Sequence, residues 1–313
     1  MGDLWIYILI VILVAYLSLS YVLYLRVFKM DPDKDYRVVD QNSEFFKASY
    51  EWYQKVPKEE ISIKSYDNVT LKGKFIPSLD NESTNLAIIV HGYHANLEDM
   101  IIIGKFYSDL GFKVMLLDMR GHGQSEGAFT TLGHFEKYDL KKWIHFALRT
   151  YGATDQILLH GVSMGASTIF LSTTLNLPQN VKFIVADSGF DSIWNMLWNN
   201  LKPKALRIIL PGASIISFLS RRFFFGSVSV SQAVRKNRIP LMIIHGEKDE
   251  KVPFAVGKAL HEISKAPTKD FFQVPNCKHG EGYIVDKNGY EQRLILHLKD
   301  YFNIKNTYLK QKK

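Results

Sequence analysis

The chain has 313 residues, 47% of them hydrophobic, so it can bury one substantial core. A single cysteine excludes an internal disulfide framework, and no Cys/His cluster has the spacing of a structural zinc site. The formal charge is +8, but residues 192–238 hold eight basic side chains and no acidic one, while the other 31 basic residues balance the 31 acidic ones. This basic segment is interleaved with aromatic and aliphatic residues. It therefore suits an anionic membrane surface better than nucleic acid, for which no recognition motif is present.

An apolar stretch opens the chain. Residues 4–25 carry no charged side chain, and as a helix they rise about 33 Å, enough to cross a hydrocarbon core of about 30 Å. A cleaved signal peptide is disfavoured because only three residues precede the stretch and none is basic. We therefore predict a membrane anchor over residues 1–30. Arg26 and Lys29 follow the apolar stretch, which predicts a single-pass cell-membrane protein with its body on the cytoplasmic side.

The remainder of the chain is predicted to hold one large domain. Residues 31–58 form a linker with a helix at 41–55, and the domain, 59–313, opens with a hairpin of extended runs. Short runs that are apolar on both faces then alternate with helix-length segments, which predicts an α/β protein with a mainly parallel central sheet flanked by helices. The hairpin runs are 60–64 and 70–76, and the apolar runs are 86–90, 113–117, 156–159, 183–186, 241–244 and 271–274. The segment at about 190–238 is longer than a crossover requires, so we predict a helical lid divided at Pro203 and Pro211.

Polar residues follow the predicted strands where ligand chemistry gathers in such sheets. Gly161-Val162-Ser163-Met164-Gly165 fits the pattern G-x-S-x-G between a strand and a helix, where small residues permit a sharp turn that exposes the serine. A serine nucleophile needs a base within hydrogen-bond reach and a third group that orients the base. Asp249 and His279 each follow a later strand, in the required order. We predict Ser163 as nucleophile, His279 as base and Asp249 as the orienting acid.

An oxyanion hole is expected from two backbone N–H groups, those of Met164 and Tyr93, because they follow the nucleophile and the first central parallel strand. Asp187 remains an alternative acid, although a cap or turn role is the simpler interpretation. Cys277 is expected to be a packing residue. Four histidines that directly follow strands are expected to have structural roles, bonded to the backbone. They are His91, His122, His160 and His245.

Together these motifs resemble the α/β-hydrolase superfamily over residues 60–302. The residues that carry the resemblance occur in the family's order and spacing: His91-Gly92, Asp118-x-Arg120-Gly121-His122-Gly123-x-Ser125, the Ser163 motif, His245-Gly246-x-x-Asp249-x-x-Val252-Pro253 and His279-Gly280. The chain looks most similar to bacterial membrane-anchored hydrolases of the esterase or lipase type. The resemblance implies the α/β-hydrolase fold and hydrolysis of carboxylic (acyl) esters through an acyl-enzyme, with no metal or organic cofactor.

The expected substrate is a small-molecule or lipid acyl ester, reached from the membrane that the N-terminal helix enters. The basic lid is a further candidate membrane contact, and no nucleic-acid partner is expected. Two alternatives stay open, because this fold serves many reactions. One is thioesterase or peptidase activity of the same fold, and the other is a catalytically silent, membrane-anchored binding protein.

Overall fold

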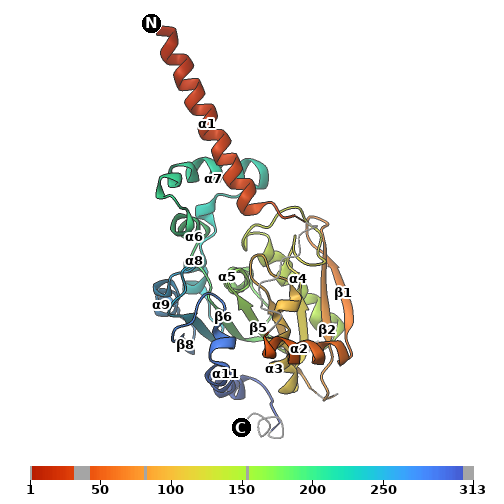
Figure 1. The fold of residues 1–313 in the computed structure, drawn as a ribbon. Coiled ribbons are helices and arrows are strands. Elements are labelled where there is room, and N and C mark those ends of the chain that lie inside the picture. The colour runs from red at the N-terminus through yellow and green to blue at the C-terminus, as the bar shows by residue number, and fades with distance from the viewer. Residues whose placement is uncertain (1, 32–42, 81–82, 153–154, 306–313) are drawn as a thin grey trace.

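The structure is a computed structural model that describes residues 2–31, 43–80, 83–152, 155–305. Its centre is an eight-stranded sheet in the order β1-β2-β4-β3-β5-β6-β7-β8 (Figure 1). The strands are β1 Glu59–Lys64, β2 Thr70–Ile76, β3 Asn85–Val90, β4 Lys113–Leu117, β5 Gln156–Val162, β6 Val181–Asp187, β7 Leu241–Gly246 and β8 Lys269–Val274.

Strand pairing confirms the predicted mainly parallel sheet. β1 and β2 form the antiparallel hairpin expected at the start of the domain, and β2 also pairs antiparallel with β4. Every other neighbouring pair is parallel. β5 extends to Val162, beyond the predicted apolar run, so the strand ends directly before Ser163. The carboxyl ends of the parallel strands therefore meet at the edge that carries the predicted site residues.

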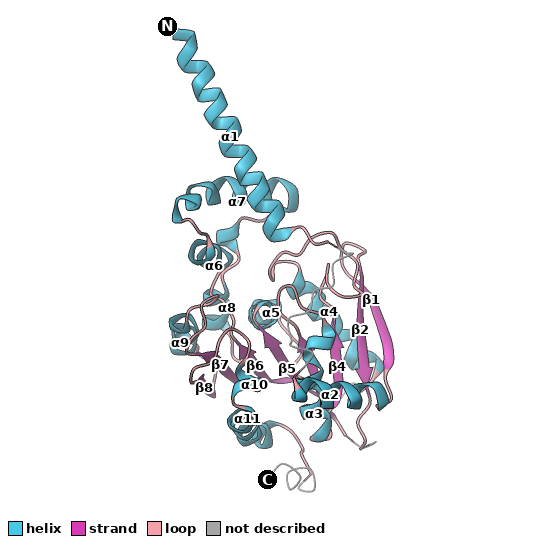
Figure 2. Ribbon diagram, viewed as in Figure 1, coloured by secondary structure: helices cyan, strands magenta, loops and turns pink. Residues whose placement is uncertain are grey.

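Helices cover both faces of the sheet (Figure 2). α4, α5 and α8 contribute to a core on one face, and α2, α3 and α11 contribute to a core on the other. The helix predicted over residues 41–55 begins at Glu44, capped by the Ser43 hydroxyl, which accepts from the N–H of Phe46; residues 41–42 lie outside the described residues. The helices of the domain outside the lid are α2 Glu44–Lys55, α3 Ile101–Asp109, α4 Glu136–Thr150, α5 Met164–Ser172, α9 Phe254–Ile263, α10 Gly282–Val285 and α11 Lys287–Tyr301, with short 3-10 turns at η1 Leu97–Met100 and η2 Thr173–Leu175.

The segment between β6 and β7 is helical, as predicted. Pro203 caps η3 and Pro211 lies in the first turn of α7, where a missing N–H costs no helical hydrogen bond. Phe223 and Phe225 pack against Phe28 at the end of the N-terminal helix. This lid consists of α6 Ile193–Asn200, η3 Lys204–Ile209, α7 Leu210–Arg221, η4 Phe225–Ser227 and α8 Val230–Lys236.

The N-terminal helix α1, Gly2–Phe28, projects from the body beside α7 (Figures 1 and 2). Among the described residues it is the one helix long and apolar enough to cross a membrane. Its inner end differs from the predicted freely spanning stretch. Ser20, Leu23, Tyr24 and Phe28 are buried in the protein, so the last turns of α1 belong to the packed body.

Candidate active site

Ser163 lies at a sharp turn between β5 and α5. Its backbone has φ +55° and ψ −113°, a conformation that non-glycine residues rarely adopt and that persists only when the surroundings enforce it. The flanking glycines explain how the turn fits. A Cβ at Gly161 would lie 2.4 Å from the carbonyl carbon of Gly165, and a Cβ at Gly165 would lie 2.2 Å from the oxygen of Val90. The G-x-S-x-G pattern is therefore a packing requirement of this turn.

A continuous hydrogen-bonded chain joins the three predicted residues. The Ser163 hydroxyl donates to Nε2 of His279 at 2.8 Å, and Nδ1 of His279 donates to Oδ2 of Asp249 at 2.7 Å. Ser163 and His279 are partly buried, whereas Asp249 is 5% exposed. In this arrangement the histidine ring presents a lone pair to the serine, as a general base must.

Asp249 is fixed on both carboxylate oxygens. Its Oδ1 accepts from the N–H groups of Lys251 and Val252 at 3.0 and 2.8 Å, which leaves Oδ2 for His279. Burial opposes the charged form, but hydrogen bonds from His245 and His279 hold the pKa of Asp249 well below its usual range. The group is thus an anion, able to orient His279 and to stabilise its protonated form.

His245 bonds the backbone, as predicted, and also contacts the carboxylate of Asp249. Its Nε2 donates to the carbonyl of Val252 at 2.8 Å, the backbone contact expected of it, and also lies 3.3 Å from Oδ2 of Asp249. The ring is fully buried, so it braces the acid and its turn together. The spacing His245-Gly246-x-x-Asp249 could have indicated this contact, because one turn of the chain brings Asp249 back beside the histidine.

The loop after β3 lies against Ser163. A Cβ at Gly92 would be 3.3 Å from the Cβ of Ser163, so the backbone that leads into Tyr93 passes directly over the serine. Met164 is the first residue of α5, and its N–H has no acceptor within the helix. The two predicted oxyanion-hole residues therefore flank Ser163 from two separate elements.

Two histidines tie this loop to the loop after β4. Nδ1 of His91 donates to the carbonyl of Gly92 at 2.6 Å, while its Nε2 accepts from the N–H of Met119 at 2.9 Å. His122 accepts from the N–H of His94 at 3.2 Å. Burial lowers the pKa of His91 to about 3, so the ring is neutral and keeps one nitrogen as an acceptor. Their predicted structural role is confirmed, and its effect is to hold the backbone around Tyr93.

Asp187 is not the cap or turn residue that the sequence suggested. It ends β6 at 2% exposure, where its carboxylate accepts from Ser188 Oγ at 2.8 Å and from the Tyr290 hydroxyl at 3.2 Å. Burial raises its pKa. Ser188, whose backbone has φ +55°, also accepts from the N–H of Gly280 at 3.1 Å. Asp187 thus supports the loop that carries His279 through Ser188, and contacts neither His279 nor Ser163 through a side-chain hydrogen bond.

His160 corrects another expectation. Its ring bonds two side chains, the hydroxyls of Tyr107 at 2.8 Å and Tyr290 at 3.0 Å, instead of the backbone. Burial lowers the pKa of His160 to about 3. A strand-end position therefore indicated a structural histidine correctly, but the partners lie on α3 and α11, which the local sequence does not reveal.

Cys277 is a packing residue, as predicted. It is 1% exposed and burial raises the pKa of its thiol to about 12, so almost no thiolate exists near neutral pH. A buried thiol with a raised pKa is a poor nucleophile, which agrees with a packing role. The thiol donates weakly to the carbonyl of Lys278 at 3.1 Å, next to His279.

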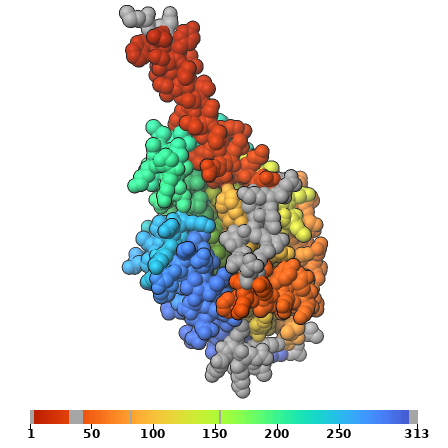
Figure 3. Space-filling model, viewed as in Figure 1, coloured from red at the N-terminus to blue at the C-terminus, as the bar shows by residue number. Residues whose placement is uncertain are grey.

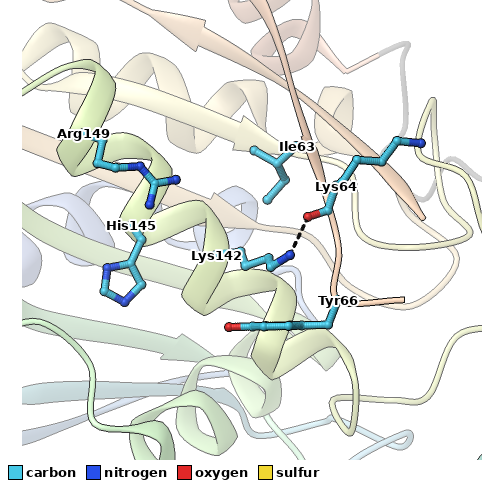
Figure 4. A pocket seen from close by; sticks show the side chains of 6 residues that line it. All are labelled: Ile63, Lys64, Tyr66, Lys142, His145 and Arg149. Atoms are coloured by element: carbon cyan, nitrogen blue, oxygen red, sulfur yellow. Dashed lines mark hydrogen bonds between the residues drawn. The ribbon is translucent and has the colours of Figure 1, made fainter. Parts of the chain in front are cut away.

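One cavity on the described surface, about 400 Å³ in volume, lies between β1 and α4 (Figure 4). Lys142 donates to the carbonyl of Lys64 there and lies 4.2 Å from the ring centre of Tyr66. None of the three hydrogen-bonded site residues lines this cavity. Its walls are formed by Ile63, Lys64, Tyr66, Lys142, His145 and Arg149.

Comparisons with known proteins identify the fold. Residues 86–212 match the family described as alpha/beta hydrolase fold. The uncharacterized protein YqkD of Bacillus subtilis is 27% identical over 84% of this chain and 85% of its own, and the uncharacterized membrane protein YNL320W of Saccharomyces cerevisiae is 22% identical over 74% and 76%. The Pyrococcus furiosus esterase Pf2001 superimposes with a TM-score of 0.67 at 22% identity, covering 88% of this chain and 100% of that one.

Proposed function

We propose that this protein, which has the α/β-hydrolase fold, is a serine hydrolase that cleaves carboxylic acyl esters through an acyl-enzyme. The observation that carries the proposal is the chain of hydrogen bonds from Ser163 through His279 to Asp249, with the serine held in a strained turn. A buried packing motif has no need of such strain, whereas a nucleophile gains exposure and orientation from it.

The proposed reaction begins with attack of Ser163 Oγ on the acyl carbon. His279 Nε2 takes the hydroxyl proton, while Asp249 keeps the ring oriented and stabilises the positive charge. The N–H groups of Tyr93 and Met164 donate hydrogen bonds to the substrate oxygen as it becomes negatively charged. His279 then returns the proton to the leaving alcohol. A water molecule, activated by the same base, releases the acid and restores Ser163.

Lipophilic acyl esters are the proposed substrates. The lid above the strand ends is rich in aromatic and aliphatic side chains, among them Trp194, Met196 and Leu201, which pack at the edge of the core as partly buried residues. We further propose that α1 anchors the protein in the cell membrane as a single span, with the domain on the cytoplasmic side because Arg26 and Lys29 follow the span.

Active-site labelling tests the proposal. Wild type should react covalently with a fluorophosphonate probe, and Ser163→Ala should not. Ser227→Ala, an exposed serine of the lid, serves as the matched control and should label like wild type. Hydrolysis of p-nitrophenyl esters graded from acetyl to palmitoyl then reports acyl preference. Absence of labelling in folded wild type would favour a silent binding protein instead.

A further inference from the structure

The free part of α1 is short for a membrane span. Residues 4–19 are exposed except for half-buried Tyr16, and at about 1.5 Å per residue they extend about 24 Å. The hydrocarbon core of a bilayer is about 30 Å thick, so a shortfall of about 6 Å remains. From Ser20 onward the helix is fixed to the protein, where Ser20 Oγ donates to the carbonyl of Ile209 at 3.2 Å. If α1 spans the bilayer, the shortfall is met either by local thinning of the bilayer or by entry of the protein at the base of α1. The surface at that base distinguishes the two.

α7 lies at that base and packs closely against α1; in Figure 3 its green surface adjoins the red surface of α1. A Cβ at Gly212 would be 2.3 Å from Ser20 Oγ, so the two backbones approach as closely as only a glycine permits. A second bond, from Ser220 Oγ to the Tyr24 hydroxyl at 2.8 Å, fixes the other end of the crossing. The depth of α7 is thus set by the depth of α1.

The outward face of α7 is apolar. Pro211, Ile215 and Leu219 are exposed and spaced four residues apart, and Ile208 extends the same stripe from the preceding turn. Ile208, Ile215 and Leu219 are 72%, 52% and 65% exposed. A surface helix normally turns its polar side chains to water, so an apolar outer stripe indicates a non-aqueous neighbour.

Cations flank this stripe. Lys202, Lys204 and Arg222 are exposed beside it, and Arg26 and Lys29 are exposed at the end of α1. Because residues 192–238 contain no acidic side chain, nothing within the lid neutralises these cations. An apolar stripe edged by Lys and Arg is the pattern of a helix lying in the interface of an anionic membrane, where such helices reach about 5–10 Å below the headgroups. That depth matches the shortfall of α1.

We propose that α7 is a second membrane contact, seated in the headgroup and acyl boundary of the leaflet that α1 enters, on an anionic bilayer. The proposal rests on α1 being a membrane span, and not on catalysis. It has a consequence for the substrate, because the Tyr93 loop beside Ser163 bonds the last turn of α1. The Tyr93 loop would then lie near the membrane surface, where lipid-dissolved esters are concentrated.

Depth-dependent fluorescence quenching tests whether α7 lies in the membrane interface. Full-length protein is reconstituted in vesicles of phosphatidylcholine with a minor fraction of phosphatidylglycerol, and an environment-sensitive fluorophore is attached at Leu219→Cys. Val11→Cys on α1 reports the span, and Leu296→Cys, which is 66% exposed on α11 at the far end of the molecule, reports water. Wild type is the labelling blank because Cys277 is buried. Lipids carrying a shallow nitroxide should quench position 219, lipids carrying a nitroxide deep in the acyl chain should quench position 11, and neither should quench position 296.

The outcomes are distinct. Quenching at 11 without quenching at 219 overturns the seating of α7 and leaves the anchor in place. No quenching at either position overturns the span, and with it this inference, whatever the enzyme does with soluble esters. The contribution of the lid cations to membrane binding is measured with the double substitution Lys204→Glu/Arg222→Glu, made in the Leu219→Cys protein. This variant should show weaker quenching at 219 than its parent when phosphatidylglycerol is present, and an unchanged value would contradict the anionic preference.

Discussion

The hydroxyl of Tyr93 donates a hydrogen bond of 2.9 Å to the backbone carbonyl of Val27, in the last turn of α1. That carbonyl is one of the orphan acceptors at a helix end, so the tyrosine supplies a partner that the helix itself lacks. Tyr93 also provides one of the proposed oxyanion-hole N–H groups. The side chain of Tyr93 therefore joins α1 to the loop that faces Ser163.

This bond gives the first prediction. Tyr93→Phe removes the hydroxyl alone and keeps the ring packing, so kcat for a soluble ester should fall by about 2- to 10-fold, the worth of one hydrogen bond of about 0.5–1.5 kcal/mol. KM should stay near the wild-type value because no substrate contact is removed. The exposed Tyr66 offers a matched Tyr→Phe control. An unchanged kcat would show that the loop holds its position without α1.

The second prediction concerns Ser163 and His279, the proposed nucleophile and base, as a unit. Ser163→Ala and His279→Ala should each lower kcat by up to about 10⁶-fold, and the double variant should lower it little further, because each change already removes the same step. Circular dichroism should show that all three remain folded. Additive losses in the double variant would mean that the two side chains act in separate steps.

Much of this site was predictable because its signals are local. The turn around Ser163 needs small residues at 161 and 165, and parallel strands bring their carboxyl ends to one edge, so the order of Ser163, Asp249 and His279 was enough to assemble them. The burial of the inner end of α1 was not predictable. Tyr24 lies in the predicted apolar span and Phe28 in the predicted anchor segment, and only long-range contacts with the lid reveal that both belong to the protein core.

The same limit applied to Asp187, and the two carboxylates give the third prediction. Asp249→Asn should lower kcat by about 10⁴-fold, because an amide cannot stabilise the protonated histidine or fix its tautomer. Asp187→Asn should lower kcat far less, since its side chain reaches His279 only through Ser188 and the loop at Gly280. Steady-state kinetics of both variants decide the question. A loss at Asp187 equal to that at Asp249 would assign the acid to both.

The last prediction concerns stability and pH at the hairpin that opens the domain. Arg120, in the loop after β4, is 5% exposed and donates to Asp67 at 2.9 and 3.2 Å. These bonds join the β1–β2 turn to that loop. Arg120 also donates to Asp139 of α4. The hydrogen bond from Arg120 lowers the pKa of Asp67 to about 2. A carboxyl with a lowered pKa in the folded state stabilises it fully above the pKa of the unfolded chain, about 3.9, and loses that contribution as the pH falls toward the folded value.

Melting temperatures of wild type and Asp67→Asn, measured from neutral pH downward, should therefore differ by a constant amount above about pH 5 and converge below about pH 4, because the unfolded carboxyl has a pKa of about 3.9. The wild type should be the more stable across the upper range. Asp109→Asn, which removes an ion pair with Lys105 on the surface of α3, is the control for a partly exposed pair. A gap that persists unchanged to the acid limit would mean that the loss in Asp67→Asn comes from packing of the turn and not from its charge.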